Sequence, residues 1–142
     1  MSKISPEMDV LPRFLQYGEE TSFDARSLIF KDNEAVSQKP VFYVIAGLIK
    51  ATYTFRDSTF TLWVPPDGIF GLVEPLAECK RLCAAQAMER SILYCWDLDG
   101  FFTAAGVAWE LALQATTGLT RELRILNAEF GERLSLQEPG DA

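Results

Sequence analysis

Residues 66–83 hold side chains that together are suited to binding a small anion. Gly68 and Gly71 lie in a turn, and glycine lets the backbone come close to a ligand. A short helix-compatible run follows over 73–78, and the N–H groups that open a helix attract anions. Arg81 comes next, with a planar, permanently charged guanidinium that can clamp a phosphate or a carboxylate. The segment predicts an anion-binding turn with one arginine, although a purely structural role would produce the same pattern.

The other reactive residue types do not predict a second site. The chain has no histidine, which removes the commonest general base and the usual zinc ligand. Cys79 and Cys83 lie four residues apart, but without a histidine or a third clustered cysteine they predict no metal or iron–sulfur site. A redox thiol beside Lys80 stays an alternative, because nearby cations activate thiols. Cys95 is expected in the core. We expect a protein that is not an enzyme and that binds no metal.

The elements that must position residues 66–83 fit a single domain over residues 1–142. Residues 1–20 are predicted to be a helical lead-in, because apolar residues between Met8 and Tyr17 have helical spacing. Short strands with frequent turns over 21–98 predict an antiparallel barrel or sandwich. Residues 99–136 have a helical pattern. The fold class is therefore α+β, mainly β.

Two hairpins are expected within the β region. Leu48–Val64 alternates apolar and polar residues on both sides of a turn at residues 56–58. Residues 82–88 and 91–98 form a second candidate pair of strands, with Glu89 and Arg90 at the turn between them.

The C-terminal helical region carries an apolar or neutral stripe that repeats every seven residues. Its positions are Trp109, Ala112, Thr116, Leu119, Leu123, Leu126 and Phe130. A straight helix of about 27 residues is roughly 40 Å long, which is too long to pack only on a small barrel. We therefore expect the stripe to form a homodimer seam. The charged residues beside the seam are expected to set its register, and they are Arg121, Glu122, Arg124 and Glu129.

The charge and hydropathy of the chain narrow its partners. Thirteen basic and twenty acidic residues give a net charge of −7, which argues against phosphate-backbone binding. No apolar run reaches the ~18 residues that a membrane span needs. The N-terminus has no signal-peptide pattern. We expect a cytoplasmic protein that binds neither membranes nor nucleic acids.

The order of these elements resembles the cyclic-nucleotide-binding domain, as in the sensor half of catabolite-activator-type bacterial regulators. Residues 42–50 (FYVIAGLIK) resemble a strand pair of that family, and residues 67–71 (DGIFG) resemble the start of its phosphate-binding cassette. Arg81 falls ten residues after Gly71, which is the family spacing for the phosphate arginine. Residues 97–102 resemble the strand end and first helix that follow. The resemblance spans about residues 14–136.

The resemblance implies a jelly-roll barrel, or double-stranded β-helix, with a short N-terminal helix and a long C-terminal dimerisation helix. It implies a ligand-sensing regulatory domain that binds a cyclic nucleotide, cyclic AMP or cyclic GMP, or another small anion. The signal would pass through the dimer helix. The ligand cassette would be residues 66–83, with binding residues Gly71, Leu72, Glu74, Arg81, Leu82 and Cys83.

Three departures from the family pattern leave an alternative open. Leu72 stands where the family usually has the glutamate that holds the ribose, and Glu74 is a possible surrogate two residues later. Cys83 replaces a small hydroxyl residue, and Arg26 stands near a usual glycine. The alternative is a degenerate module of the same fold that binds no ligand and acts in dimerisation or protein docking. The family's DNA-binding helix-turn-helix is not expected within these residues.

Overall fold

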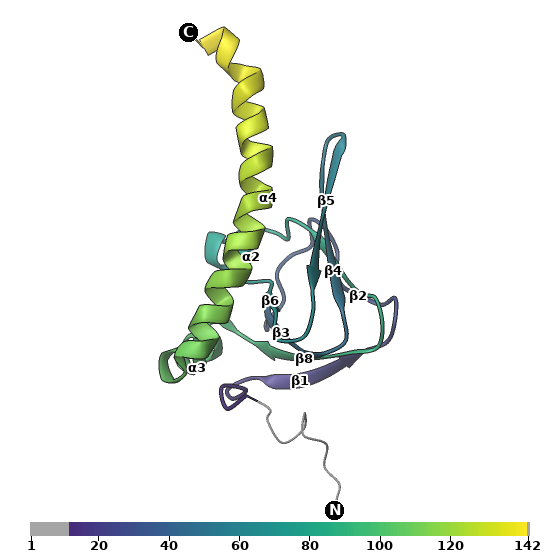
Figure 1. The fold of residues 1–142 in the computed structure, drawn as a ribbon, viewed down its shortest axis with the longest axis vertical. Coiled ribbons are helices and arrows are strands. Elements are labelled where there is room, and N and C mark those ends of the chain that lie inside the picture. The colour runs from purple at the N-terminus through teal and green to yellow at the C-terminus, as the bar shows by residue number, and fades with distance from the viewer. Residues whose placement is uncertain (1–11, 142) are drawn as a thin grey trace, which may run out of the picture.

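The computed structural model describes the backbone of residues 12–141 and the side chains of residues 12–128. Two four-stranded antiparallel sheets and three helices make up this part of the chain (Figure 1). The strands are β1 (Glu19–Phe23), β2 (Leu28–Phe30), β3 (Val41–Ala46), β4 (Ile49–Phe55), β5 (Ser58–Val64), β6 (Ile69–Phe70), β7 (Ala84–Ala87) and β8 (Ser91–Trp96). The helices are α2 (Val73–Ala77), α3 (Leu98–Val107) and α4 (Trp109–Asp141).

The two sheets face each other and enclose an apolar core. One sheet has the strand order β1-β8-β3-β6, and the other has the order β2-β7-β4-β5. Side chains on β3 alternate between two sides: Phe42 and Val44 join the core between the sheets, whereas Val41 and Tyr43 face the helices. β3 is buried on both faces, which explains why its sequence is an unbroken apolar run. This is the mainly β, jelly-roll architecture that the sequence predicted.

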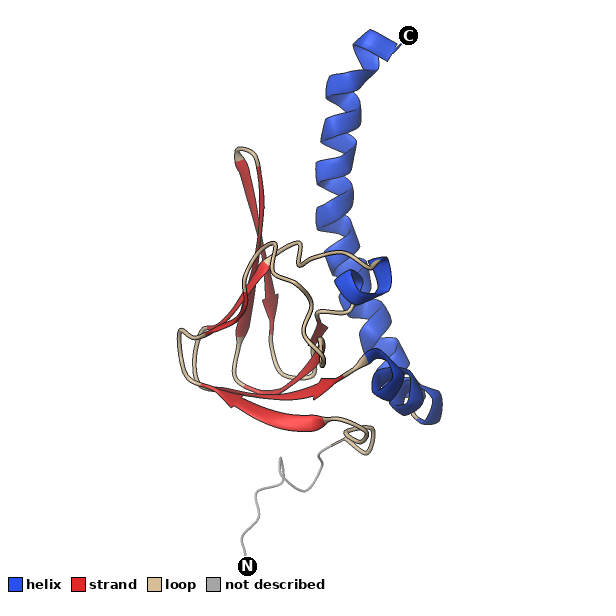
Figure 2. Cartoon of the chain, turned by 180° about the vertical axis from the view of Figure 1, so that it is seen from behind, coloured by secondary structure: helices blue, strands red, loops and turns tan. Residues whose placement is uncertain are grey.

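The helices gather on one side of the sheets (Figure 2). A second apolar cluster lies there, in which Trp96 and Phe101 stack edge to face and Leu111 of α4 is fully buried. Asp97 caps α3 by accepting a hydrogen bond from the N–H of Gly100 at 2.7 Å. These contacts hold α4 against the barrel at its N-terminal end, while its C-terminal part extends beyond the sheets (Figure 1).

One predicted hairpin is confirmed and the other is wrong. β4 and β5 pair over seven residues, from Ile49 opposite Val64 to Phe55 opposite Ser58. β7 and β8, in contrast, lie in different sheets, because β7 pairs with β2 and β4 while β8 pairs with β1 and β3. The chain crosses from one sheet to the other at the Glu89–Arg90 turn. Local alternation is the same for a hairpin and for a crossover, so it could not separate them.

The helical lead-in is not seen where the structure describes it. Residues 12–18 form turns, and the rest of the predicted helix lies outside the described residues. Phe14 is buried edge to face against Tyr43, and the carbonyl of Gln16 accepts a hydrogen bond from the Trp96 indole at 2.7 Å. Tyr17 has a φ of 73°. These tertiary contacts hold the segment in a turn, although the spacing of its apolar residues predicted a helix.

The C-terminal helical region divides at Ala108, where the backbone is extended. Gly118 lies in α4 where the helix crosses β6. A Cβ there would sit 2.6 Å from the carbonyl oxygen of Ile69, so only glycine permits this approach. The helix continues through Gly131 to Asp141.

Candidate anion-binding site

Arg81 is buried beneath the segment that contains α2, with 2% of its surface exposed. Its Nη1 donates to the carbonyl of Gly71 at 3.0 Å and to Oε1 of Glu74 at 2.9 Å. Its Nη2 donates to the carbonyl of Pro40 at 2.9 Å. The guanidinium also lies over the ring of Phe30, 3.9 Å from the ring centroid. The predicted phosphate arginine is therefore held entirely by groups of its own chain.

Glu74 supplies the negative charge that balances Arg81. Both side chains of this ion pair are 1% exposed. The second carboxylate oxygen of Glu74 accepts a hydrogen bond from the backbone N–H of Leu82 at 3.1 Å. One guanidinium and one backbone N–H thus form a cradle for an oxyanion, and a carboxylate of the protein fills it.

The local backbone explains how Glu74 reaches this position. Gly71 has a φ of 85°, and a Cβ there would collide with the carbonyl oxygen of Pro40. The turn at Gly71 leads directly into α2, whose first turn carries Glu74 as its buried residue. Glu78 ends the helix in the left-handed conformation, with a φ of 57°. The single helical turn between these two residues points Glu74 inward at Arg81.

The other predicted ligand residues do not face a shared space. Leu72 packs in the apolar cluster beneath the helices, whereas Cys83 packs in the core between the sheets. Leu82 contributes its backbone N–H to the cradle, and its side chain packs against the core. The predicted residues that the structure brings together are therefore Gly71, Glu74, Arg81 and Leu82.

Aromatic rings fill the core beside the cradle. Phe42 and Phe70 stack with centroids 4.9 Å apart, and Phe30 lies about 6 Å from both. Tyr53 is 1% exposed in the same cluster. This packing stabilises the barrel and covers the Arg81 guanidinium.

Sequence reasoning missed a buried carboxyl group on α4. Glu122 is 3% exposed and accepts a hydrogen bond from the Tyr53 hydroxyl at 3.0 Å. Burial, and next the charge of Glu74, raise the pKa of Glu122 to about 8. The side chain of Glu122, which was expected beside the dimer seam, faces the barrel. Its spacing from Leu111 and Ala115, both buried, could have revealed this face.

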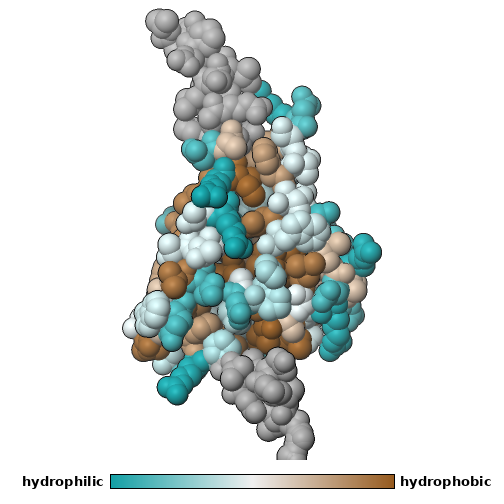
Figure 3. Space-filling view, viewed as in Figure 1, coloured by the Kyte–Doolittle hydropathy of each residue, from teal (hydrophilic) through white to brown (hydrophobic). Residues whose placement is uncertain are grey.

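The predicted seam lies largely on the exposed side of α4. Trp109 is 70% and Leu123 53% exposed, and Ala112 and Thr116 are also exposed. Hydrophobic side chains are visible on the part of α4 that faces the viewer in Figure 3.

The remaining seam positions are less open. Leu119 and Leu126 are half-buried and pack against the two apolar clusters. The side chain of Phe130 lies outside the described residues. A groove of about 670 Å³ runs along α4, lined by Thr120, Leu123, Arg124, Leu126 and Asn127.

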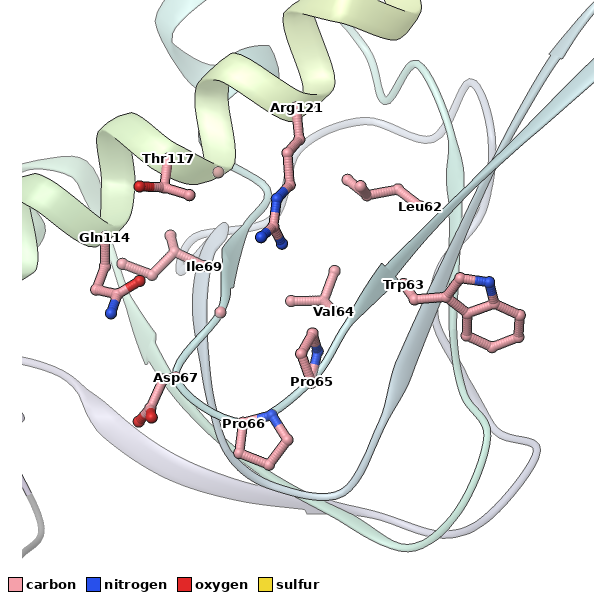
Figure 4. Close-up of a pocket in the computed structure, with 12 residues that line it drawn as sticks. Leu62, Trp63, Val64, Pro65, Pro66, Asp67, Ile69, Gln114, Thr117 and Arg121 are labelled. Carbon is pink, nitrogen blue, oxygen red and sulfur yellow. The ribbon is translucent and has the colours of Figure 1, made fainter.

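A smaller cavity of about 110 Å³ lies between α4 and the β5–β6 connection. Arg121 extends from the helix into this space, with Thr117 and Gln114 of the same helix to one side and Val64 below (Figure 4). Arg121 therefore points to the barrel side of α4, not to the seam.

Within residues 12–141, no helix is both long and apolar enough to cross a bilayer. No group of three or more histidine, cysteine or acidic side chains with metal-site spacing occurs among the described side chains.

Comparisons with known proteins place this geometry in a fold family. No protein-family model matches the sequence, and no curated protein matches it. Among solved structures, the catabolite activator protein of Thermus thermophilus matches with a TM-score of 0.66 and 23% identity, over 95% of this chain and 62% of that one. The present chain thus spans about three fifths of that protein.

Two other matches agree. The heme domain of CooA from Carboxydothermus hydrogenoformans has a TM-score of 0.68 and 18% identity, over 89% of this chain and 88% of that domain. A mutant form of a cAMP-binding acyltransferase from Mycobacterium smegmatis has a TM-score of 0.55 and 15% identity, over 63% of this chain and 28% of that one. The chain therefore has the fold of the cyclic-nucleotide-binding domain of catabolite-activator-type regulators.

Proposed function

We propose that the chain is a regulatory, non-catalytic domain that senses a small anion at Arg81. The observation that carries the proposal is the oxyanion cradle, in which the guanidinium of Arg81 and the N–H of Leu82 converge on one carboxylate. A cyclic nucleotide phosphate has the charge and the acceptor oxygens that these donors suit. Cyclic AMP and cyclic GMP are the first ligands to test, because a solved structure of this fold is described as cAMP-binding.

The route from the cradle to α4 supports a signalling role. Glu122 of α4 lies buried in the barrel on Tyr53, and the charges of Glu74 and Arg81 both act on it. A ligand that rearranges the Glu74–Arg81 pair changes the electrostatic environment of the helix. A shift in α4 then requires the ligand to bind one helix position more tightly than the other.

Isothermal titration with cyclic AMP and cyclic GMP, from micromolar to millimolar, tests the proposal. We expect binding to the native chain, its loss in Arg81→Ala, and no change in Lys80→Ala, the matched control, because Lys80 is the exposed neighbouring cation. Arg81→Ala leaves Glu74 buried and unpaired, which can destabilise the fold. Arg81→Lys, which keeps a positive charge beside Glu74, is the second variant for that case. Absence of binding at millimolar nucleotide would remove the cyclic nucleotides as ligands.

A second candidate function is a ligand-free module for dimerisation or protein docking. The burial of Arg81 under Glu74 and Phe30 favours it. Thermal melting with a panel of nucleotides and other small anions separates the two functions. A site saturated at a hundred times its Kd adds about 2.7 kcal/mol, so a true ligand raises Tm by several degrees. No shift with any compound supports the second candidate.

Both candidates include a homodimer formed through the exposed face of α4. Trp109 and Leu123 leave large apolar areas in solvent, and the groove at Leu123 gives a partner helix a place to pack. Leu123→Glu is expected to yield monomers in sedimentation equilibrium, whereas Thr117→Glu, an exposed position on another face of α4, leaves the dimer intact. Equal masses for both variants would place the interface elsewhere.

A further inference from the structure

The Glu74 carboxylate occupies the same donors that an incoming oxyanion needs. Oε1 lies 2.9 Å from Nη1 of Arg81, and Oε2 lies 3.1 Å from the backbone nitrogen of Leu82. A phosphate or sulfate can accept hydrogen bonds from these two donors through two of its oxygens, as this carboxylate does. Because Glu74 and Arg81 are each 1% exposed, an external anion cannot reach these donors while Glu74 stays in place.

We propose that Glu74 is a built-in competitor that keeps the oxyanion cradle closed, and that an anion binds only when Glu74 leaves. This inference rests on the proposed anion-sensing function and adds its regulation. The remaining bonds of Arg81, to the carbonyls of Gly71 and Pro40, come from the backbone and hold the guanidinium in place without Glu74. When the carboxylate is removed, the Arg81 guanidinium therefore keeps its orientation but has no counter-charge.

The segment that carries Glu74 is built to move as a unit. α2 is one short helical turn, bounded by Gly71 at a φ of 85° and by Glu78 at 57°. No side chain caps its N-terminus, and the apolar side chain of Leu76 on its outer surface is 46% exposed. A rotation at the two flanking residues would carry Glu74 off Arg81 without unfolding a strand.

Departure of Glu74 also changes the electrostatic environment of other buried groups. The Glu74 charge raises the pKa values of both Cys83 and Glu122, after the larger effect of burial. Exchange of this carboxylate for an anion of different charge or position alters the environment of Glu122, through which α4 contacts Tyr53. Opening of the cradle therefore changes the charge that acts on Glu122 of α4.

Chemical rescue tests the inference with inorganic phosphate as the probe. Tm is measured for the native chain, Glu74→Ala and Glu74→Gln in phosphate and in chloride of equal ionic strength. We expect the Tm of the native chain to differ between the two salts only by the general stabilisation that phosphate gives folded proteins. Glu74→Ala melts lower in chloride, and saturating phosphate raises its Tm by about 5 °C or more. Glu78→Gln, which alters an exposed glutamate at the end of α2, behaves like the native chain.

The double variant Glu74→Ala with Arg81→Ala locates the effect. Its Tm is expected to respond to phosphate no more than that of the native chain, because the cation is gone. If the double variant responds as Glu74→Ala does, the phosphate binds elsewhere and the inference is wrong. If Glu74→Ala folds in neither salt, Glu74→Gln decides, since its amide keeps the shape and lacks the charge. A Glu74→Gln response no larger than that of the native chain overturns the inference.

Titration of the same variants with cyclic AMP separates this inference from the proposed function. If the native chain binds cyclic AMP and Glu74→Ala binds it tenfold more weakly, Glu74 holds the ligand. The proposed sensing function is then supported, and the inference that Glu74 competes with the anion is wrong. If phosphate raises the Tm of Glu74→Ala while no variant binds a cyclic nucleotide, the inference that Glu74 competes with the anion is supported. The cyclic nucleotides are then excluded as ligands.

Discussion

The buried carboxyl of Glu122 makes the stability of this fold depend on pH in a specific direction. Glu122 is 3% exposed, and burial followed by the Glu74 charge raises its pKa to about 8 from an ordinary value of 4.5. Between these two values the folded chain holds a proton at this site that the unfolded chain has released. The free energy of unfolding therefore falls as pH rises from 4.5 to 8, and the contribution is lost above 8.

The size of the effect follows from the pKa difference. Each pKa unit corresponds to about 1.4 kcal/mol, so the full change is on the order of 5 kcal/mol. Glu122→Gln keeps an oxygen that can accept the Tyr53 hydrogen bond and removes the titration. Relative to the native chain, this variant is expected to gain stability steadily between pH 5 and pH 8.

Urea denaturation of both proteins from pH 5 to pH 9 measures this difference. Subtraction of the two curves cancels the titrating groups that do not interact with Glu122, so the difference reports Glu122 and the groups coupled to it. Glu110→Gln, at an exposed position in the first turn of the same helix, is the control and should give a difference that does not change with pH. If the Glu122→Gln difference is the same at pH 5 and at pH 8.5, Glu122 does not hold a proton in the folded chain and the reasoning fails.

Three other predictions follow from the packing. Gly118→Ala should lower stability by about 1–3 kcal/mol in thermal melts, because its Cβ meets the Ile69 carbonyl at 2.6 Å. Gly106→Ala, with nothing within 4 Å of the new Cβ, should be neutral or stabilising by up to about 1 kcal/mol; equal effects at both glycines would contradict the close approach. Cys79, the most accessible thiol, should react with a disulfide reagent at pH 8 well before Cys83 and Cys95, and Cys79→Ser should remove the fast phase. Burial raises the pKa of the Cys95 thiol to about 11, so its reaction should speed up only in denaturant.

The local elements were the most predictable part of this protein. The β4–β5 hairpin follows from alternation on both sides of one turn, because its partners are neighbours in sequence. The run over residues 41–46 is apolar on both faces, and β3 is buried on both sides. The spacing of Gly71 and Arg81 indicated an anion-binding element, and the two residues do meet, since Arg81 donates to the Gly71 carbonyl.

The sequence by itself therefore determined the class of the fold and the presence of a cation suited to an anion. What only the tertiary structure decided is which anion Arg81 meets and which way α4 faces. Glu74 is seven residues from Arg81, and its local pattern fits a ligand residue as well as an internal partner. Glu122 meets Tyr53 from 69 residues away. Hydrogen-bond partners in a barrel depend on how strands and helices that are far apart in the sequence pack together. A periodic pattern reports only which face of one element is apolar, so it contains no information about this packing.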